Sequence, residues 1–265
     1  YNTHMLIRSS AELEQYQAAA KLSTEVLGQL RQAVCVGVTP LEIDALAARL
    51  CAERNAVPNF LGVGSPGNTY KHSTCISVND TILHGIPNDV PLKKGDIVKV
   101  DFGLRYQGIN TDHCFTVAVG GFLNQQDEQL VKTARAAVQK AARLAVAGTH
   151  VGDLGYAMAS TAWDAGFDVV KEFVGHGIGK TLHEEPQIPA YGKKGKGEVL
   201  REGMVVCVEA QVVAGSDEIV WGDDGWTITT KDGGNSAMFE YMVVVGKRKP
   251  IFLTPTLEWP IMTES

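Results

Sequence analysis

Three acidic residues lie inside apolar, β-branched runs of the kind that form buried strands. Asp101 lies in the run 97–104, Glu209 in 204–213 and Glu240 in 237–245. Burying an unpaired carboxylate costs on the order of several kcal/mol, even after the protein relaxes around it. We therefore expect an external positive charge beside these three carboxylates.

A fourth acid, Asp112, follows Asp101 after a hairpin predicted around Gln107 and Gly108. The two carboxylates are therefore expected to face one site from adjacent strands. An exposed strand end would explain Asp112 alone about equally well, but it explains all four acids poorly.

The charge of this acidic set indicates how many metal ions it can hold. Four carboxylates carry −4, which two divalent ions neutralise and one does not. Two ions roughly 3.5–4 Å apart stabilise both the attacking and the developing oxygen of a hydrolysis, with a metal-activated hydroxide as the nucleophile. Oxygen ligands with one imidazole suit Mn, Fe or Co, with Zn as an alternative. The acids thus predict two divalent metal ions per chain (Co, Mn, Fe or Zn).

Within the segment 174–186, residues 179–181 are Gly-Lys-Thr, the sequence that ends a phosphate-binding loop. The phosphate-loop pattern requires glycine where Val174 stands, and Pro186 with two acids makes a poor first helical turn. We expect its glycines to bend the backbone and bring His176 to the acids. A lone loop histidine is usually structural or solvated, so His176 and His183 gain a functional interpretation only from the carboxylates.

A second glycine-rich pattern, G-x-G-x-x-G, spans 62–67. A dinucleotide-binding loop needs a strand before this pattern and a helix opening within it. Here a helix and Pro58 precede it, and Pro66 continues it as loop. We therefore predict a surface or rim loop.

The elements that must position these residues follow the order helices, then strands, twice. Helices are predicted at 10–30, 39–54, 124–147 and 153–165, with Thr39 as the cap of the second. Strand-like runs fill 75–119 and 168–245. This segregation favours an α+β fold in one domain over a doubly wound sheet.

The two halves of the chain also match in detail. The stretch 84–87, His-Gly-Ile-Pro, leads to Gly95, and Asp101 stands six residues later. The stretch 183–186, His-Glu-Glu-Pro, leads to Gly203, and Glu209 stands six residues later. Chance resemblance is the alternative, but the joint match favours a duplicated unit with a pseudo-twofold axis. We expect halves of about 10–120 and 121–246 in a single domain of residues 6–265, after a cloning remnant at 1–5. The segment 193–197 is the clearest candidate for a flexible loop.

Composition narrows the class of protein. The chain has 265 residues, 45% hydrophobic, which is enough for a sizeable core. Its net charge is −6 and its basic residues do not cluster, which argues against nucleic acid or anionic membrane as main partners. Five cysteines without a C-x-x-C pair indicate reduced thiols in a cytoplasmic protein. There is no apolar run of transmembrane length.

Several motifs together resemble the type I methionine aminopeptidases over about residues 10–245. They are Gly175-His-Gly-Ile-Gly179, His183-Glu-Glu-Pro186, His84-Gly-Ile-Pro87, Lys94-Gly-Asp-Ile-Val98 with Asp101, and Asp224-Gly-Trp226. The resemblance implies a pita-bread fold: a pseudo-twofold duplicated half with a shared curved antiparallel sheet and helices on the outer face. It also implies five metal ligands, which fall on Asp101, Asp112, His176, Glu209 and Glu240.

The same resemblance implies roles for residues beside the metals. His183 would polarise the scissile carbonyl, His84 would position the substrate amide, and Glu209 would act as proton shuttle. The pocket for the methionine side chain would be lined by Cys75, Trp226, Phe60, Val63 and Leu182.

The chain departs from the family pattern around that pocket. Phe60 and Val63 stand where a Cys and a Tyr are usual, about four extra residues precede Cys75, and Leu182 replaces a Phe. Near the ligands, Asn110 and Thr111 precede Asp112, Ala210 follows Glu209, and Tyr241 follows Glu240. These changes bear on side-chain preference rather than on the metal ligands.

The sequence therefore predicts an enzyme that removes the amino-terminal methionine of nascent proteins and peptides, preferring a small second residue. A proline-directed aminopeptidase or dipeptidase of the same fold is the alternative, although those enzymes tend to carry an extra amino-terminal domain. A non-catalytic binding protein on this fold would be expected to lose ligands, and all five are present. We expect a cytoplasmic monomer that contacts the ribosome transiently.

Overall fold

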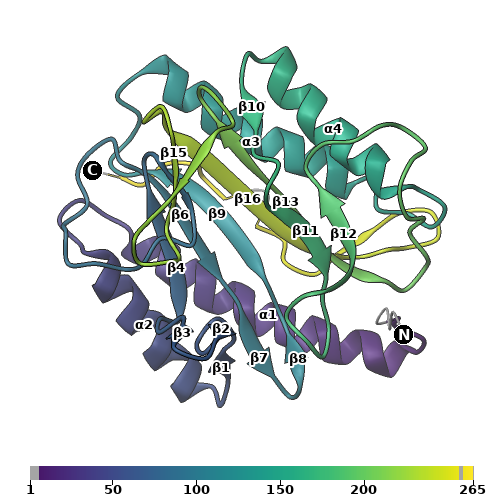
Figure 1. The fold of residues 1–265 in the computed structure, drawn as a ribbon. Helices are drawn as coiled ribbons and strands as arrows, with labels where there is room; N and C mark the ends of the chain where they lie inside the picture. Colours follow the sequence, from purple (N-terminus) through teal and green to yellow (C-terminus); the bar gives the residue numbers. More distant parts are fainter. Residues whose placement is uncertain (1–5, 257–258, 265) are drawn as a thin grey trace.

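The computed structural model describes residues 6–256 and 259–264, so the predicted remnant at 1–5 lies outside the described residues. An antiparallel sheet crosses the molecule, with α1 and α2 packed near one end and α3 and α4 near the other (Figure 1). One hydrophobic core contains side chains from all four helices and from one face of this sheet. The helices are α1 (Ser10–Ala33), α2 (Pro40–Glu53), α3 (Gln125–Ala142) and α4 (Val151–Asp164).

Local capping explains where the helices begin. The Ser9 side chain accepts a hydrogen bond from the backbone of Glu12 at the start of α1. At the start of α2, Thr39 and Glu42 form a reciprocal capping box, and Pro40 occupies the first turn. These signals lie within four residues of sequence, so the predicted helix starts lie close to the observed ones.

The third helix ends earlier than predicted, at Ala142 rather than near residue 147. Beyond it, Val146 forms a bridge with Gly246, and the Ala147 N–H donates to the Gly246 carbonyl at 2.9 Å. A partner about 100 residues away in sequence therefore ends this helix.

The large sheet has nine strands in the described part of the chain. Its order is β12-β11-β13-β16-β9-β6-β4, with β10 paired to β13 and β17 to β16. This order is symmetric about the β16–β9 pair, with β6 opposite β13 and β4 opposite β11, as expected from a duplication; the exact halves stay a prediction. The strands are β4 (Thr74–Val78), β6 (Ile97–Phe102), β9 (His113–Ala118), β10 (Asp168–Val169), β11 (Val174–Gly177), β12 (Glu184–Pro189), β13 (Val205–Val213), β16 (Ser236–Val244) and β17 (Ile251–Phe252).

Three small sheets lie around the large one. The predicted turn at Gln107 and Gly108 is present: both residues have positive φ, 50° and 84°, as a two-residue hairpin requires. The pattern at 62–67 is a loop with a short exposed hairpin, as predicted. The small strands are β1 (Val57–Pro58), β7 (Leu104–Tyr106) and β8 (Ile109–Asn110); β5 (Thr81–Leu83), β14 (Ile219–Trp221) and β15 (Ile228–Thr230); and β2 (Gly64–Ser65) with β3 (Asn68–Thr69).

Along the central strands, apolar side chains project to one face of the sheet and acidic side chains to the other. In β13, Val206, Val208 and Ala210 join the helix-covered core. Their neighbours Cys207 and Glu209 therefore face the opposite side of the sheet, because successive side chains of a strand alternate. The helices thus cover the apolar face and leave the other face for the acidic residues.

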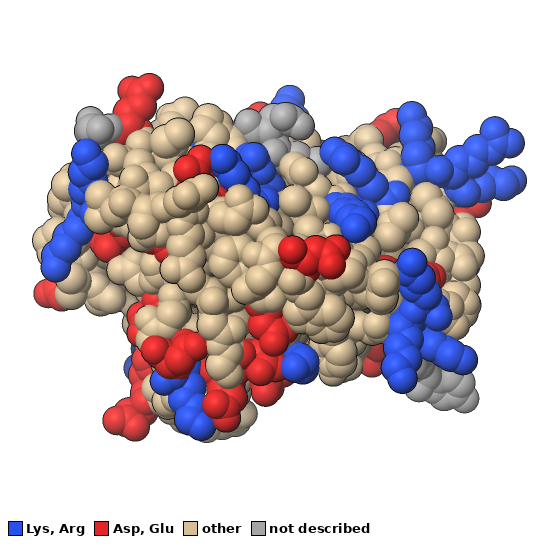
Figure 2. All heavy atoms as spheres, turned by 90° about the horizontal axis from the view of Figure 1, so that it is seen from above, with Lys and Arg blue, Asp and Glu red and all other residues tan. Residues whose placement is uncertain are grey.

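The outer surface carries both signs of charge. Figure 2 shows Lys and Arg spread over the face seen from above, with Asp and Glu among them. Within the described residues, no helix combines the length and the apolar character needed to cross a bilayer. All five cysteines are free.

The segment 193–197 is attached to the start of α4. The Gly195 N–H donates to Asp153 at 2.8 Å, and the Gly152 N–H donates to the Lys196 carbonyl at 3.0 Å. The flexibility expected of this segment stays a prediction.

Candidate active site

One row of directly paired residues crosses five neighbouring strands on the sheet face away from the helices. Cys75 pairs with Asp101, Asp101 with Cys114, Cys114 with Glu240, and Glu240 with Glu209. Opposite residues of an antiparallel pair project to the same face with Cβ atoms roughly 4.5–5.5 Å apart. Strand register therefore brings together three acids that are far apart in sequence.

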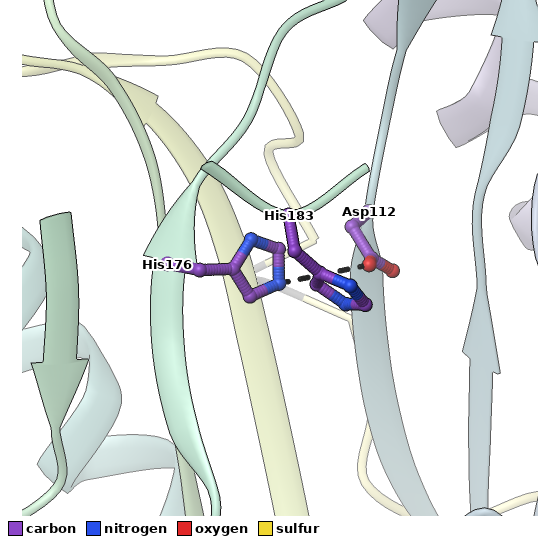
Figure 3. Close-up of side chains that lie close together, drawn as sticks. All are labelled: Asp112, His176 and His183. Carbon is purple, nitrogen blue, oxygen red and sulfur yellow. Dashed lines mark ion pairs between the residues drawn. The ribbon is translucent and has the colours of Figure 1, made fainter. Parts of the chain in front are cut away.

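Asp112 and the two histidines of the glycine-rich segment complete the cluster. Asp112 immediately precedes β9, and its carboxyl contacts that of Asp101. Figure 3 shows Asp112, His176 and His183 pointing toward one another from three segments. The ring centroids of His176 and His183 are 4.5 Å apart. His176 Nε2 lies 3.9 Å from Asp112 Oδ2 and also 3.9 Å from Glu209 Oε1.

His176 is held as a neutral imidazole rather than as a cation. Its Nδ1 is 2.9 Å from the Gly177 carbonyl, which can only accept, so Nδ1 carries the proton and Nε2 presents its lone pair to the acids. Burial lowers the pKa of His176 to about 3. The contacts of Nε2 with Asp112 and Glu209 are therefore not ion pairs, and they match the spacing of groups around a metal.

The glycines beside His176 act differently from the prediction. Neither Gly175 nor Gly177 has a positive φ. A Cβ on Gly175 would lie 2.4 Å from the Cys207 carbonyl oxygen, and one on Gly177 would lie 2.2 Å from the Glu185 carbonyl oxygen. These glycines let β11 lie close to its neighbouring strands, with a register shift between Gly175 and Gly177, rather than forming a sharp bend.

Three of the four carboxyl groups have a buried oxygen without a hydrogen-bond partner in the described part of the chain, and burial shifts the pKa values of all four. Asp101 Oδ1, Asp112 Oδ1 and Glu240 Oε1 are buried without a hydrogen-bond partner among the described residues. Burial raises the pKa of Asp101 to about 7 and that of Glu209 to about 8. It raises the pKa values of Asp112 and Glu240 well above their usual range, with the neighbouring acids adding to the shift.

Lys99, the basic residue nearest to Asp101 in β6, does not neutralise this cluster. Its ammonium donates to the carbonyls of Asn79 at 2.8 Å and Ser236 at 3.1 Å. It therefore joins β6 to two other segments and does not pair with the acids.

The donor set fits divalent metal ions. One potential ligand atom each from Asp101, Asp112 and Glu240 lies within 4.8 Å of the others, and the same holds for Asp112, His176 and His183. Cys207 also lies near His176 and Glu240. Burial raises the pKa of the Cys207 thiol, so the carboxylates and the neutral imidazole are the better ligands.

A cavity of about 510 Å³ joins the acidic cluster to an apolar pocket. All twelve residues predicted for the site line it. The metal-ligand candidates are among them, together with the two neighbouring histidines: Asp101, Asp112, His176, Glu209 and Glu240, with His84 and His183. The predicted side-chain pocket residues also line it: Phe60, Val63, Cys75, Leu182 and Trp226.

His84 is fixed by an unusual backbone. It has φ of 53°, a left-handed conformation that non-glycine residues seldom adopt, and Gly85 follows it. A Cβ on Gly85 would lie 2.4 Å from the Ile76 carbonyl oxygen, so this loop lies directly against β4. The His84 ring meets Phe173 edge-on, with centroids 5.5 Å apart. Burial lowers the pKa of His84 to about 4, so the ring is neutral near pH 7.

Sequence reasoning missed several residues of the site. Tyr70 is buried in the apolar pocket, where its hydroxyl donates to the carbonyls of Thr74 and Gly85. Phe173 lines the cavity beside His84. Gln211 donates to Glu209 Oε2 at 2.6 Å. Gln211 stands two residues after Glu209 on the same strand, so the period-two rule could have found it. Tyr70 lies outside the regular strands and carries no such signal.

The chain has many relatives among known proteins. The sequence profile of metallopeptidase family M24 matches residues 14–247. The chain belongs to this family. A methionine aminopeptidase from Clostridium perfringens is 34% identical over 251 residues, covering 94% of this chain and 98% of the relative. The crystal structure of a methionine aminopeptidase from Rickettsia prowazekii superposes with a TM-score of 0.90 at 33% identity, covering 94% of this chain and 99% of that one.

These relatives confirm the family resemblance and the α+β pita-bread fold predicted from the sequence. A prolidase from Pyrococcus furiosus superposes with a TM-score of 0.74 at 21% identity, covering 95% of this chain and 66% of that one. At that identity the likeness shows the fold alone.

Proposed function

We propose that this chain is a metal-dependent aminopeptidase that removes amino-terminal methionine from peptides and proteins with a small second residue. The observation that carries the proposal is the position of the carboxylate row. Asp101, Glu240 and Glu209 lie in register on the wall of a cavity that is also lined by an apolar cluster around Phe60 and Cys75. A substrate can therefore place its peptide bond at the acids and its first side chain in the apolar pocket.

The proposed ligands are Asp101, Asp112, His176, Glu209 and Glu240. Their buried carboxyl oxygens, three of them without a hydrogen-bond partner among the described residues, and the Nε2 lone pair of His176 suit two divalent ions of Co, Mn, Fe or Zn. When bound, such ions would supply Lewis-acid polarisation and a nucleophile at neutral pH. The hydrogen bond from Gln211 to Glu209 Oε2 leaves Oε1 facing His176, where it can take up and release a proton.

The two neighbouring histidines act as neutral donors. Burial lowers the pKa values of both His84 and His183, so each ring can donate a hydrogen bond near pH 7 without adding charge to the cleft. By family resemblance, His183 donates to the oxygen of the scissile carbonyl as its negative charge develops. His84 orients the substrate amide.

The apolar end of the cavity suits a methionine side chain. Phe60, Tyr70 and Cys75 form a buried cluster, against which Leu182 and Trp226 pack. A flexible thioether makes favourable contacts with aromatic rings. An apolar pocket separates side chains that differ by one methylene by only ~1–3 kcal/mol, so Phe60 and Val63 can change the ranking of methionine against leucine or norleucine without abolishing it.

A small peptide panel tests this proposal. The values of kcat/KM would be measured for Met-Ala-Ser, Met-Leu-Ser, Leu-Ala-Ser, Ala-Pro-Gly and acetyl-Met-Ala-Ser with Mn²⁺ and Co²⁺. We expect Met-Ala-Ser to be the best substrate and the acetylated peptide to resist cleavage, because the free amine binds at the metal end. Preference for Leu-Ala-Ser, or cleavage of the acetylated peptide, would refute the assignment.

The same panel separates the alternatives. Cleavage of Ala-Pro-Gly in preference to Met-Ala-Ser would favour a proline-directed enzyme, and metal binding without any cleavage would favour a binding protein. As a further part of the proposal, the enzyme acts in the cytoplasm as a monomer on nascent chains during transient contact with the ribosome. Gel filtration and ribosome co-sedimentation test the last two points.

A further inference from the structure

The exposed β2–β3 hairpin lies against the turn that carries Trp226. The indole Nε1–H of Trp226 donates to the side-chain oxygen Oδ1 of Asn68 at 2.9 Å. A Cβ on Gly64 would lie 2.8 Å from the indole ring, and a Cβ on Gly225 would lie 2.6 Å from the Asn68 amide nitrogen. A glycine from each segment therefore permits this close approach.

The backbone of Trp226 is fixed separately from its ring. Asp224 Oδ1 accepts the backbone N–H groups of Trp226 and Thr227, each at 2.8 Å. Asp224 Oδ2 accepts the Thr227 hydroxyl at 2.6 Å. These bonds hold the turn, but they do not set the side-chain torsions of Trp226, whose ring is only partly buried. The hydrogen bond to Asn68 holds the far edge of the indole.

The inner side of the Trp226 indole contacts the residues that line the apolar part of the cavity. The indole meets the Tyr70 ring edge-on with centroids 5.1 Å apart, and it packs against the cluster of Phe60, Tyr70 and Cys75. It also meets the His84 ring, with centroids 6.4 Å apart. Trp226 is therefore a wall of the side-chain pocket, and it contacts the histidine proposed to orient the substrate amide.

We propose that Asn68 is a positioning residue that sets the enzyme's selectivity for methionine by holding Trp226 as a wall of the pocket. The inference rests on the proposed function. A wall that can rotate outward makes room for branched side chains, whereas the flexible methionine side chain adapts to either position. Loss of the Asn68 acceptor therefore reduces discrimination more than it reduces cleavage of methionine peptides.

Three variants of Asn68 test this role. Asn68→Ala removes the acceptor, Asn68→Ser is too short to reach the indole, and Asn68→Asp keeps an oxygen at the same distance as a matched control. The values of kcat/KM would be measured for Met-Ala-Ser and Leu-Ala-Ser, together with the metal content. We expect the Met-to-Leu ratio to fall about fivefold in the first two variants, the effect of one typical hydrogen bond. The ratio and the metal content should stay near wild type in Asn68→Asp.

A double-mutant cycle with Trp226→Phe separates positioning from a general structural effect. Phenylalanine has no N–H to donate, so Asn68→Ala should change the ratio little in that background. Acrylamide quenching of tryptophan fluorescence gives a readout without substrate. The contribution of Trp226 is the part of the fluorescence that Trp226→Phe removes. We expect this part to become more accessible to acrylamide in Asn68→Ala and to stay unchanged in Asn68→Asp.

The outcomes distinguish this inference from the proposed function. A wild-type chain that cleaves no methionine peptide would refute the proposed function. A wild-type chain that cleaves such peptides, with an unchanged Met-to-Leu ratio in Asn68→Ala and Asn68→Ser, would overturn the role of Asn68 alone. An equal loss of selectivity with and without the Trp226 N–H would also overturn it.

Discussion

His176 and His183 are neighbours, but the chain holds them in different ways. His176 is buried in β11 with Nδ1 bound to the Gly177 carbonyl, so its Nε2 can only serve the acidic cluster. His183 lines the cavity with its side chain partly open to solvent, so it can reach a substrate. We therefore assign His176 to metal binding and His183 to stabilisation of the reacting carbonyl.

The variant His183→Ala tests this division. A donor aimed at developing oxyanion charge contributes ~2.7–4 kcal/mol, so we expect kcat to fall by about 10²–10³-fold while two ions stay bound. Metal content and peptide hydrolysis would be measured on the same sample, with His176→Ala as the matched variant that loses metal. If His183→Ala lost metal and activity in parallel, His183 would be a ligand.

For Glu240, unlike His183, we expect substitution to remove metal as well as activity. It is fully buried between Cys114 and Glu209 in the row, and its Oε1 has no partner among the described residues. We expect Glu240→Ala to lose tight binding of at least one ion and to lose nearly all hydrolysis. Isothermal titration with Mn²⁺ measures this directly. Tight binding of two ions by Glu240→Ala would remove Glu240 from the ligand set.

At the scale of the elements, strand register builds the site. The sequence was enough to place Asp101, Glu209 and Glu240 in buried strands, because a carboxylate inside an apolar β-branched run is a local signal. It could not show that Cys75, Asp101, Cys114, Glu240 and Glu209 form one row, since that depends on pairing across five strands.

The limits of local sequence information appear elsewhere in the fold. Capping residues predicted the helix starts, whereas the end of α3 depends on pairing of Val146 with Gly246. The resemblance supplied Trp226 as a pocket residue, but neither it nor the local pattern pointed to Asn68. The hydrogen bond between these two residues spans 158 positions of sequence.

Lys99 joins β6 to β16 and to the turn at Asn79, and we expect its replacement to lower the free energy of unfolding. It is 1% exposed, and its ammonium donates to the carbonyls of Asn79 and Ser236 and to the Ser236 hydroxyl. Lys99→Met removes three buried hydrogen bonds of the ammonium, which costs about 1–3 kcal/mol of unfolding free energy. Urea unfolding would measure the loss, with the exposed Lys132→Met expected within about 0.5 kcal/mol of wild type. Equal midpoints for the two variants would contradict this account of Lys99.

At the scale of the whole molecule, the fold buries the acidic residues on one face of the sheet while its helices cover the other face. In the metal-free protein, burial raises the pKa of Asp101 to about 7 and that of Glu209 to about 8, above their unfolded values near 4. At these two carboxyl groups the folded state then holds more protons than the unfolded state between about pH 4 and pH 8. Below about pH 6.5 the buried histidines act in the opposite sense, because burial lowers the pKa of His84 to about 4 and that of His176 to about 3. The free energy of unfolding must therefore fall as pH rises from about 6.5 to 8, where the carboxyl groups dominate the proton balance.

We therefore expect the Tm of the metal-free chain to fall between about pH 6.5 and pH 8, with a slope of up to ~1.4 kcal/mol per pH unit for each additional bound proton. The metal-loaded chain should lack most of this slope, because bound ions keep the carboxylates ionised. The variant Glu209→Gln should have a shallower slope than wild type. Calorimetry at several pH values measures all three, and a Tm of the metal-free chain that rises with pH over this range would contradict the account.

The central claim is that metal ions held by the acidic row drive removal of amino-terminal methionine. The most direct test is a Mn²⁺ titration of the chelated, metal-free chain while methionine release from Met-Ala-Ser is followed. We predict no release before metal is added, restoration of activity as metal binds, and saturation of tight binding at two ions per chain. Full methionine release by the chelated chain would contradict the claim.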